Sequence, residues 1–291
     1  MEFIMTVGLP ASGKSTWAHN QENHLVLDSD AIREELWGDA GDQQNPAKVF
    51  ELMFRRTCNA MASGRSVIYC ATNITMRYRV HTLNQLKRKF PYARFRCVVF
   101  NTPVNICKQL NKKREREVPD AVIEKLARCF QMPIDNEGWD EIEIVRPVEY
   151  DGKQFSCKMW EEIKAFGSQE NPHHTLSLFD HMVRAIESVD IYAFDNDEDS
   201  REVITAAAIH DIGKAYTKSY DENGVAHYFN HAELGAYLAM NMGAPRQVVE
   251  IVNYHMCPFM DENARKAWQT RLGEKLWHKV EVLHEADVLA K

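Results

Sequence analysis

The sequence lacks any long apolar run. Nowhere do about 18 or more apolar residues follow one another, so we expect no membrane-spanning helix. The first residues, MEFIMTVGLP, also lack the basic segment and the long apolar segment of a secretory signal peptide. They predict a short strand that leads into a loop. Together these absences favour a cytoplasmic protein.

The cysteines do not follow the spacing that is typical of zinc sites or of a disulfide framework. The chain has seven cysteines, an odd number, and no two of them are spaced C-x-x-C. This argues against a disulfide framework or a zinc knuckle and favours reduced, mostly buried thiols. No internal repeat or low-complexity tract is visible either. A length of 291 residues with 45% apolar residues is enough for about two domains with cores of their own.

The net charge of −7 hides an uneven distribution. Residues 1–148 carry 21 basic and 18 acidic residues, whereas the rest carries 14 basic and 24 acidic residues. Within the first part, residues 55–128 hold 17 basic residues and only four acidic ones. Such a local excess is typical of a surface that faces a polyanion. A solvated basic face is the alternative interpretation.

Residues 1–148 alternate apolar strand-like runs with amphipathic helical stretches. We predict strands at 3–8, 24–29, 66–72, 95–101 and 141–145, and helices near 15–21, 30–37, 46–63, 76–90, 103–114 and 119–130. Buried strands separated by helices of this length indicate an α/β domain with a parallel, five-stranded sheet.

The pattern changes after residue 148. Residues 149–171 predict a polar linker with one short helix, SCKMWEEIKAFG, and residues 172–291 predict an all-α domain. Its helices are expected near 175–190, 200–215, 231–242, 245–255, 261–270 and 274–290, interrupted by the hairpin-like segment KSYDENGVAHYF.

The segment GLPASGKST, which begins at Gly8, satisfies the pattern G-x-x-x-x-G-K-[ST] between a predicted strand and a predicted helix. Its glycines let backbone N–H groups point at phosphate oxygens, and the helix N-terminus adds the positive end of its dipole. Lys14 would reach the outer phosphates of ATP or another NTP, and Ser15 would bind Mg²⁺. The predicted nucleotide-binding residues are Gly8, Ala11, Ser12, Gly13, Lys14, Ser15 and Thr16.

Five segments in order resemble the 5′-hydroxyl polynucleotide kinases, the phage RNA-repair type in particular. They are GLPASGKSTWA, LDSDAIRE, CATNITMRYR, and the two parts of LNKKREREVPDAVIEKL, which resembles the lid of that family. The likeness covers residues 1–148. It implies a P-loop kinase fold and a nucleic-acid 5′-OH end as the phosphate acceptor. It also implies that Thr72, Asn73 and Arg79 contact the acceptor.

The chemistry of this transfer suits three further residues. Asp30 is the candidate base that accepts the proton of the attacking hydroxyl. Arg33 lies one helical turn on and could grip a phosphate of the acceptor, and Arg114 could neutralise the transferred phosphoryl group. The alternatives are a helix N-cap for Asp30 and a solvated helix end for Arg114.

The T-N segment departs from the family at one point. In the family an aspartate usually precedes the Thr-Asn pair within two positions, but here the residues are Cys70 and Ala71. A carboxylate that would orient Mg²⁺ or the acceptor-side arginine is therefore missing from this segment.

Nine of the twelve histidines follow residue 172. The segments NPHHTLSLFDH, AAIHDIGK, FNHAELGA, VNYHMCP and HEADVLAK resemble, in order, the motifs of the HD superfamily of metal-dependent phosphohydrolases. The resemblance implies the metal ligands His181, His210, Asp211, His231, His255 and Asp287. Taken singly, each histidine is more often a satisfied core or surface residue.

Imidazole and carboxylate ligands suit Mn²⁺, Fe²⁺, Co²⁺ or Ni²⁺. Such an ion lowers the pKa of a bound water, and the resulting hydroxide can attack phosphorus. His231 and His255 could hold a second ion with Asp211 as the bridge, or bind the scissile phosphate. Lys214 is a candidate phosphate contact, and His174 could line the pocket.

A 5′-hydroxyl kinase and a phosphoesterase in one chain suggest a bifunctional enzyme that heals RNA or DNA ends. The first domain would phosphorylate the 5′-OH, and the second would clear a 2′,3′-cyclic phosphate or a 2′/3′-phosphate. A separate RNA ligase is then a candidate partner. In related kinase–HD fusions the HD module comes first, whereas here it comes second. The alternatives are a small-molecule or nucleoside kinase fused to a nucleotide phosphohydrolase, and a non-catalytic, ATP-gated RNA-binding module.

Overall fold

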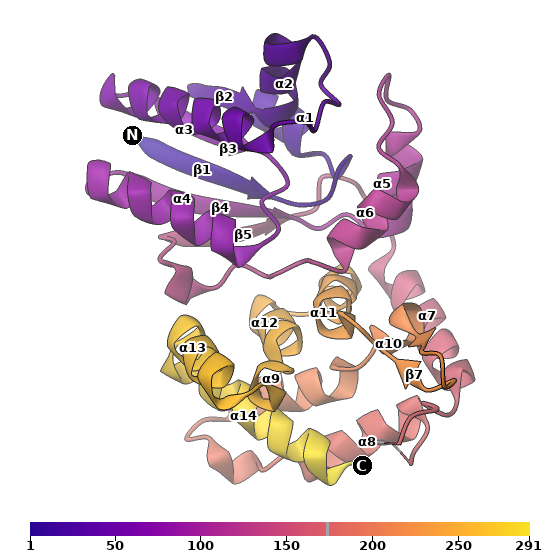
Figure 1. The fold of residues 1–291 in the computed structure, drawn as a ribbon. Coiled ribbons are helices and arrows are strands. Elements are labelled where there is room, and N and C mark those ends of the chain that lie inside the picture. The colour runs from indigo at the N-terminus through magenta and orange to yellow at the C-terminus, as the bar shows by residue number, and fades with distance from the viewer. Residues whose placement is uncertain (173–174) are drawn as a thin grey trace. The chain divides into compact units, whose positions relative to one another are not determined.

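The computed structural model describes residues 1–172 and 175–291, so His174 lies outside the described residues. The chain divides into two compact units (Figure 1). The first comprises residues 1–126 and 133–149, and the second comprises residues 127–132 and 150–291. In the described part of the chain, no helix combines the length and the hydropathy needed to cross a membrane.

A parallel five-stranded sheet forms the centre of the first unit, as the sequence predicts. Its strand order is β2-β3-β1-β4-β5. The strands are β1 (Glu2–Val7), β2 (His24–Asp28), β3 (Ser66–Cys70), β4 (Arg94–Phe100) and β5 (Glu141–Val145). The helices between them are α1 (Lys14–His19), α2 (Ser29–Trp37), α3 (Pro46–Ala62), α4 (Met76–Lys89), α5 (Val104–Asn111) and α6 (Asp120–Ala127), with the short η1 (Asp135–Glu137) before β5.

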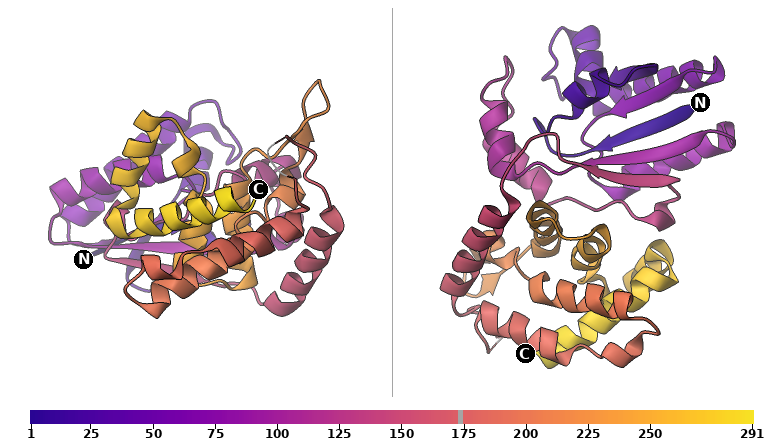
Figure 2. Two further views of the ribbon diagram at one scale, coloured as in Figure 1. Left: turned by 90° about the horizontal axis from the view of Figure 1, so that it is seen from below. Right: turned by 180° about the vertical axis from the view of Figure 1, so that it is seen from behind.

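Both faces of this sheet are covered. Figures 1 and 2 show α3 and α4 along one face. On the other face Ala18 and Trp17 of α1 pack on alternate strand residues, among them Ile4, Ile68 and Phe100. Strands buried on two sides have continuous apolar sequences rather than alternating ones, which is why these runs were recognisable in the sequence.

Part of the basic excess of residues 55–128 is neutralised within the first unit. Arg94 and Arg96 form ion pairs with glutamates of β1 and β5 on the sheet: Glu2, Glu141 and Glu143. Arg79 is buried against Glu137. The excess is therefore not one continuous polyanion-binding face, since part of it holds the sheet and its helices together.

The second unit is helical. Its helices are α7 (Gly152–Phe166), α8 (Leu178–Ser188), η2 (Ile191–Ala193), α9 (Asp197–Ile209), α10 (Lys214–Thr217), α11 (His231–Met242), α12 (Arg246–Tyr254), η3 (Cys257–Phe259), α13 (Glu262–Leu272) and α14 (Glu274–Leu289). The expected hairpin is the antiparallel pair β6 (Ser219–Tyr220) and β7 (Ala226–His227).

One helix prediction was wrong in a way that matters for the site. The sequence predicts a single helix over 200–215, but α9 ends at Ile209 and α10 begins at Lys214. The break lies where the backbone of α11 comes close: a Cβ on Gly213 would lie 2.0 Å from the carbonyl oxygen of His231. Only glycine allows this approach, which brings the start of α11 next to the His-Asp pair.

A partly buried ionic cluster joins α9 to α14. Lys279, whose side chain is 5% exposed, forms ion pairs with both Asp199 and Glu202. Burial alone would raise the pKa of Asp199, but hydrogen bonds from Lys279 and Asn196 outweigh it and lower the pKa to about 2. The ion pair therefore contributes stability above the unfolded pKa of 3.8, and loses it as the pH falls toward 2.

We expect Lys279→Met to lower the free energy of unfolding at pH 7 by about 3 kcal/mol, because it leaves two carboxylates poorly compensated. The difference from the parent should shrink as the pH falls from about 4 to about 2, where those carboxylates become neutral. Urea unfolding at several pH values measures this. Lys275→Met is the control, since that lysine is 78% exposed beside the same Asp199 and should matter little. Equal losses for both variants, or a difference that does not depend on pH, would contradict the prediction.

Candidate active sites

The phosphate-binding loop connects β1 to α1, as the sequence predicts. Two positions in it need a small residue. A Cβ on Gly8 would lie 2.8 Å from Ser12 Oγ and 2.9 Å from Phe100 Cβ. Gly13 has a φ of 94°, and a Cβ there would lie 2.9 Å from Pro147 Cγ. The tight packing of the loop on the sheet ends therefore determines its course.

Lys14 and Ser15 follow the loop and make polar contacts with it and with the end of β2. Lys14 Nζ donates to the carbonyl of Leu9 at 2.5 Å and lies 3.3 Å from Ser12 Oγ. Burial lowers the pKa of Lys14, although nearby Cys70 and Asp28 oppose the shift. The Ser15 hydroxyl donates to Asp28 Oδ2 at 2.8 Å. An amine and a hydroxyl in this arrangement suit the phosphates of a nucleotide and its Mg²⁺.

A cleft of about 820 Å³ opens at the loop. Among the predicted nucleotide-binding residues, Ala11, Gly13, Lys14, Ser15 and Thr16 line it directly, whereas Gly8 and Ser12 support the loop from behind. Its other walls come from the start of α2, from Phe50 of α3, from α6, from the segments 39–43 and 110–119, and from residues 70–72 at the end of β3. All of these walls belong to one unit of the chain.

Asp30 lies in this cleft with three arginines around its carboxylate. Arg33 Nη1 is 2.7 Å from Asp30 Oδ1, while Arg114 Nη2 and Arg116 Nη1 are 3.7 and 3.6 Å from Asp30 Oδ2. The N-cap of α2 is Asp28, whose Oδ1 accepts from the backbone N–H of Asp30. The capping role considered for Asp30 therefore belongs to Asp28, and the Asp30 side chain faces the cleft.

The T-N segment divides into one cleft residue and two supporting residues. Thr72 lines the cleft. Asn73 has a φ of 45°, a conformation that Asn tolerates better than most residues, and its amide donates to the carbonyl of Thr6 at 2.9 Å. The geometry does not bring Asn73 or Arg79 into the cleft lining. Arg79 is fully buried and donates to both oxygens of Glu137 and to the carbonyl of Asn73.

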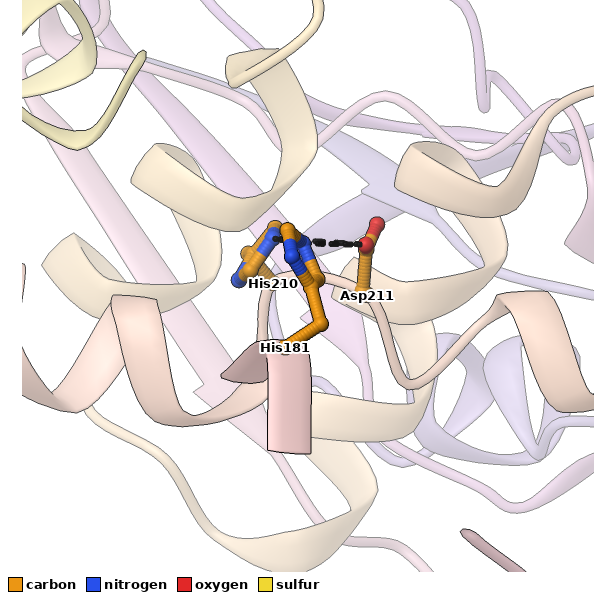
Figure 3. Close-up of side chains that lie close together, drawn as sticks. All are labelled: His181, His210 and Asp211. Carbon is orange, nitrogen blue, oxygen red and sulfur yellow. Dashed lines mark hydrogen bonds and ion pairs between the residues drawn. The ribbon is translucent and has the colours of Figure 1, made fainter. Parts of the chain in front are cut away.

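In the helical unit, five elements deliver the predicted metal ligands to one buried place. His181 lies on α8, Asp287 on α14, and His231 at the start of α11. His210 and His255 are the C-caps of α9 and α12. Figure 3 shows the imidazoles of His181 and His210 side by side, turned toward the carboxylate of Asp211.

The ligand atoms form two groups that share Asp211. In the first group, Asp211 Oδ2 is 3.2 Å from His181 Nε2 and 3.4 Å from His210 Nε2. Asp287 Oδ1 completes this group at 3.1 Å from His181 Nε2. In the second group, the other oxygen, Asp211 Oδ1, is 3.3 Å from the Nε2 of His231 and 3.8 Å from that of His255. The ligand atoms of His181, His210 and Asp211 are close enough together for one ion, and so are those of Asp211, His231 and His255.

Hydrogen bonds fix which nitrogen each imidazole presents. The four Nδ1 atoms face the backbone carbonyls of Ala290, Ala207, Tyr228 and Val252. A carbonyl only accepts, so each Nδ1 carries the hydrogen and each neutral ring turns a bare Nε2 lone pair inward. The Nε2 atoms of His181 and His210 lie 3.3 Å apart, and so do those of His231 and His255. Facing lone pairs repel unless a cation lies between them, so the residues fit divalent metal ions.

The carboxylates lead to the same conclusion. Asp211 Oδ2 and Asp287 Oδ1 are buried without a hydrogen bond of normal geometry to any residue that the structure describes, although Lys214 Nζ makes an ion pair with Asp211 Oδ2 at 2.5 Å. Burial would lower the pKa of His210, but without a metal ion the carboxylates of Asp211 and Asp287 outweigh it and raise the pKa to about 10, so a proton would then take the place of the ion at Nε2. Burial, together with the neighbouring imidazoles, lowers the pKa of His255 to about 3. The first group in particular attracts positive charge.

Lys214 lies beside Asp211 and contacts Gln169. Lys214 Nζ donates to Gln169 Oε1 at 3.0 Å and lies over the ring of Tyr228. Gln169 is fully buried, and among the described residues its Nε2 has no hydrogen-bond acceptor. Glu170, the next residue, has a φ of 49°, which is unusual for a residue other than glycine. A lysine and an amide donor beside a metal centre suit a phosphate oxygen.

Sequence reasoning missed three residues of these sites. Asp28 and Arg116 lie within segments that were recognised, but their neighbours Asp30 and Arg114 matched the family pattern instead. No motif includes Gln169, since it comes into position only through the loop between α7 and α8.

Comparisons with known proteins agree with this division of the chain. Residues 3–133 match the family model of an AAA domain, and residues 174–291 match that of an HD domain. The chain therefore joins a P-loop, kinase-like α/β domain to an HD domain, as the sequence resemblances predict. Both are domain types of enzymes. No curated protein matches the chain significantly.

Several solved structures are similar to parts of the chain, among them the following three. Two are chains of the Pnkp1/Rnl/Hen1 complex, the first described as an RNA repair complex; each is 24% identical, with TM-scores of 0.37 and 0.32. They cover 43% and 40% of this chain and 42% and 39% of their own, so this chain spans about two fifths of their length. The third, from Chloroflexus aurantiacus J-10-fl and described provisionally as a kinase, is 16% identical, has a TM-score of 0.43, and covers 56% of this chain and 96% of its own.

We expect the two ligand groups to bind two divalent ions with one shared ligand. Titration calorimetry with Mn²⁺ on chelator-treated protein should give about two ions per chain. Asp211→Asn should weaken both ions by about 100-fold or more, because it changes the ligand between the groups, whereas His181→Gln should remove one ion. His278→Gln is the control, since that histidine on α14 hydrogen-bonds to the carbonyl of Ala193 and belongs to neither group. Parent-like binding by folded Asp211→Asn protein would contradict the arrangement.

Proposed function

We propose that the protein is a nucleic-acid end-healing enzyme. Its P-loop domain would phosphorylate a 5′-OH end of RNA or DNA with ATP or another NTP. Its HD domain would hydrolyse a 2′,3′-cyclic phosphate or a 2′/3′-phosphate end. The observation that carries the proposal is the carboxylate of Asp30 within a cluster of three arginines, in the same cleft as Lys14 and Ser15.

The kinase proposal follows from the charges in this cleft. The acceptor hydroxyl would attack the γ-phosphorus, its proton would pass to Asp30, and the nucleoside diphosphate would leave. Arg33 is 8% exposed and already oriented by Asp30, so it suits a phosphate of the acceptor strand. Arg114 and Arg116 would neutralise the transferred phosphoryl group. Mg²⁺, when held by Ser15, neutralises phosphate charge.

An acceptor with its own phosphate gives Arg33 a partner. A neutral small alcohol needs a base and a positioning contact, but it offers nothing for the guanidinium group of Arg33. A nucleic-acid end carries a phosphate one nucleotide from the reacting 5′-OH, and further phosphates beyond it. Arg33 therefore favours a polymer over a free nucleoside.

The HD proposal depends on the two ligand groups and on Lys214 beside them. The histidines and aspartates of the two groups would hold divalent ions, which would lower the pKa of a bound water. Lys214 would hold a phosphate oxygen, and Gln169 would orient Lys214 while offering its Nε2 as a second donor. Because Asp211 contacts both groups, it would align the two ions for a single phosphoester.

The kinase test offers ATP labelled at the γ-phosphate, with Mg²⁺, to a 5′-OH RNA oligonucleotide. We expect label transfer by the parent and a loss of about 100-fold or more in Lys14→Ala and Asp30→Asn. Glu22→Gln is the control, a change of an exposed acid in the same unit that does not line the cleft. Competition by long RNA, long DNA and mononucleosides identifies the acceptor. Label transfer to mononucleosides alone would overturn the polymer assignment.

The HD test offers a 2′,3′-cyclic nucleotide and a 3′-phosphorylated oligonucleotide with Mn²⁺ or Ni²⁺. Asp211→Asn should lose at least about 100-fold in kcat. Lys214→Met should raise KM more than it lowers kcat, because it removes a phosphate contact but no metal ligand. Lys218→Met, a change of a nearby lysine that pairs with Glu170, is the control. Equal hydrolysis by the parent and Asp211→Asn would refute the HD assignment.

A further inference from the structure

We propose that Asp28 is the carboxylate that positions Mg²⁺ and Ser15 in the kinase site, in place of the aspartate that the T-N segment lacks. The inference rests on the proposed kinase function. It places at the end of β2 the carboxylate that the sequence pattern of the family has at the end of β3.

The sheet register makes the exchange of strands possible. Asp28 ends β2 and Cys70 ends β3, and these two residues are direct partners in the parallel ladder. Both therefore come out at the same edge of the sheet, beside the loop that follows β1. A carboxylate can move from one strand to the other and still reach the same space.

The contacts of Ser15 show that both positions face one hydroxyl. Ser15 Oγ lies 2.8 Å from Asp28 Oδ2 and 3.7 Å from Cys70 Sγ. Ser15 donates its proton to Asp28, which leaves the oxygen lone pairs for a cation. Mg²⁺ prefers oxygen ligands, often with waters that bridge to a carboxylate, so the sulfur of Cys70 cannot fill this role.

The second oxygen of Asp28 links the metal ligand to the catalytic helix. Oδ1 accepts from the backbone N–H of Asp30 at 2.8 Å and caps α2. One side chain thus holds Ser15, the expected Mg²⁺ ligand, and the start of the helix that carries Asp30 and Arg33. Asp28 also lines the cleft, so its negative charge would oppose a bare triphosphate and favour one that carries Mg²⁺.

The alternative is that Asp28 is only an N-cap. Asparagine caps a helix as well as aspartate does, so Asp28→Asn keeps that role and removes the charge. The readout is the ratio of ATP affinities measured by calorimetry with MgCl₂ and with chelator, which needs no nucleic-acid acceptor. Asp151→Asn is the matched control, since Asp151 caps α7 in the same way outside the cleft.

We expect Mg²⁺ to tighten ATP binding by the parent and by Asp151→Asn. In Asp28→Asn this enhancement should fall about tenfold or more, while the affinity for ATP without Mg²⁺ stays equal or rises. Adding Cys70→Asp or Ala71→Asp to Asp28→Asn should restore most of the enhancement, because each returns a carboxylate to the family position. Thermal melts identify the double variants that fold.

A parent-like enhancement in Asp28→Asn would overturn the inference. So would two folded double variants that both leave the enhancement low. A parent whose ATP binding depends on Mg²⁺, but which phosphorylates no 5′-OH end, would overturn the proposed function alone and leave the role of Asp28 supported.

Discussion

The helical unit depends on one buried carboxylate with a pair of imidazoles at each oxygen. Asp211 is 2% exposed, and its two oxygens face His181 with His210 on one side and His231 with His255 on the other. Such a carboxylate is stable in the interior only because positive charge lies near it, from Lys214 and from the cations that the ligand groups fit. The break between α9 and α10, together with the missing side chain of Gly213, lets the start of α11 with His231 pack close to Asp211.

The first unit uses a different constraint, the common edge at which parallel strands end. β1 delivers the phosphate loop, β2 delivers Asp28, and β3 delivers Thr72. Ligands of open α/β sheets bind at such an edge because loops from several strands meet there. Because of this geometry, a carboxylate at the end of β2 or at the end of β3 can reach the same space. A sequence pattern confined to one segment does not reveal this.

Features that depend on residues near one another in the sequence were predictable, whereas features that depend on contacts between distant segments were not. The strands were predictable because both faces of the sheet are buried, and the phosphate loop because its function depends on adjacent residues. The roles of Arg79 and Asn73 were harder to read, since a buried glutamate and a strand carbonyl, both distant in sequence, hold them away from the cleft. An exposed arginine and a buried one look alike in a sequence.

The sequence by itself determined the two domain types, their order, the phosphate loop and the set of histidines and aspartates. These are local patterns, set by side-chain periodicity and by the chemistry of neighbouring residues. Only the tertiary structure decided that Asp211 lies between two ligand groups, that Asp28 touches Ser15, that Arg116 joins the cluster around Asp30, and that Gln169 supports Lys214. Those contacts join segments whose distance and orientation depend on how strands align and how helices pack, which no single segment encodes.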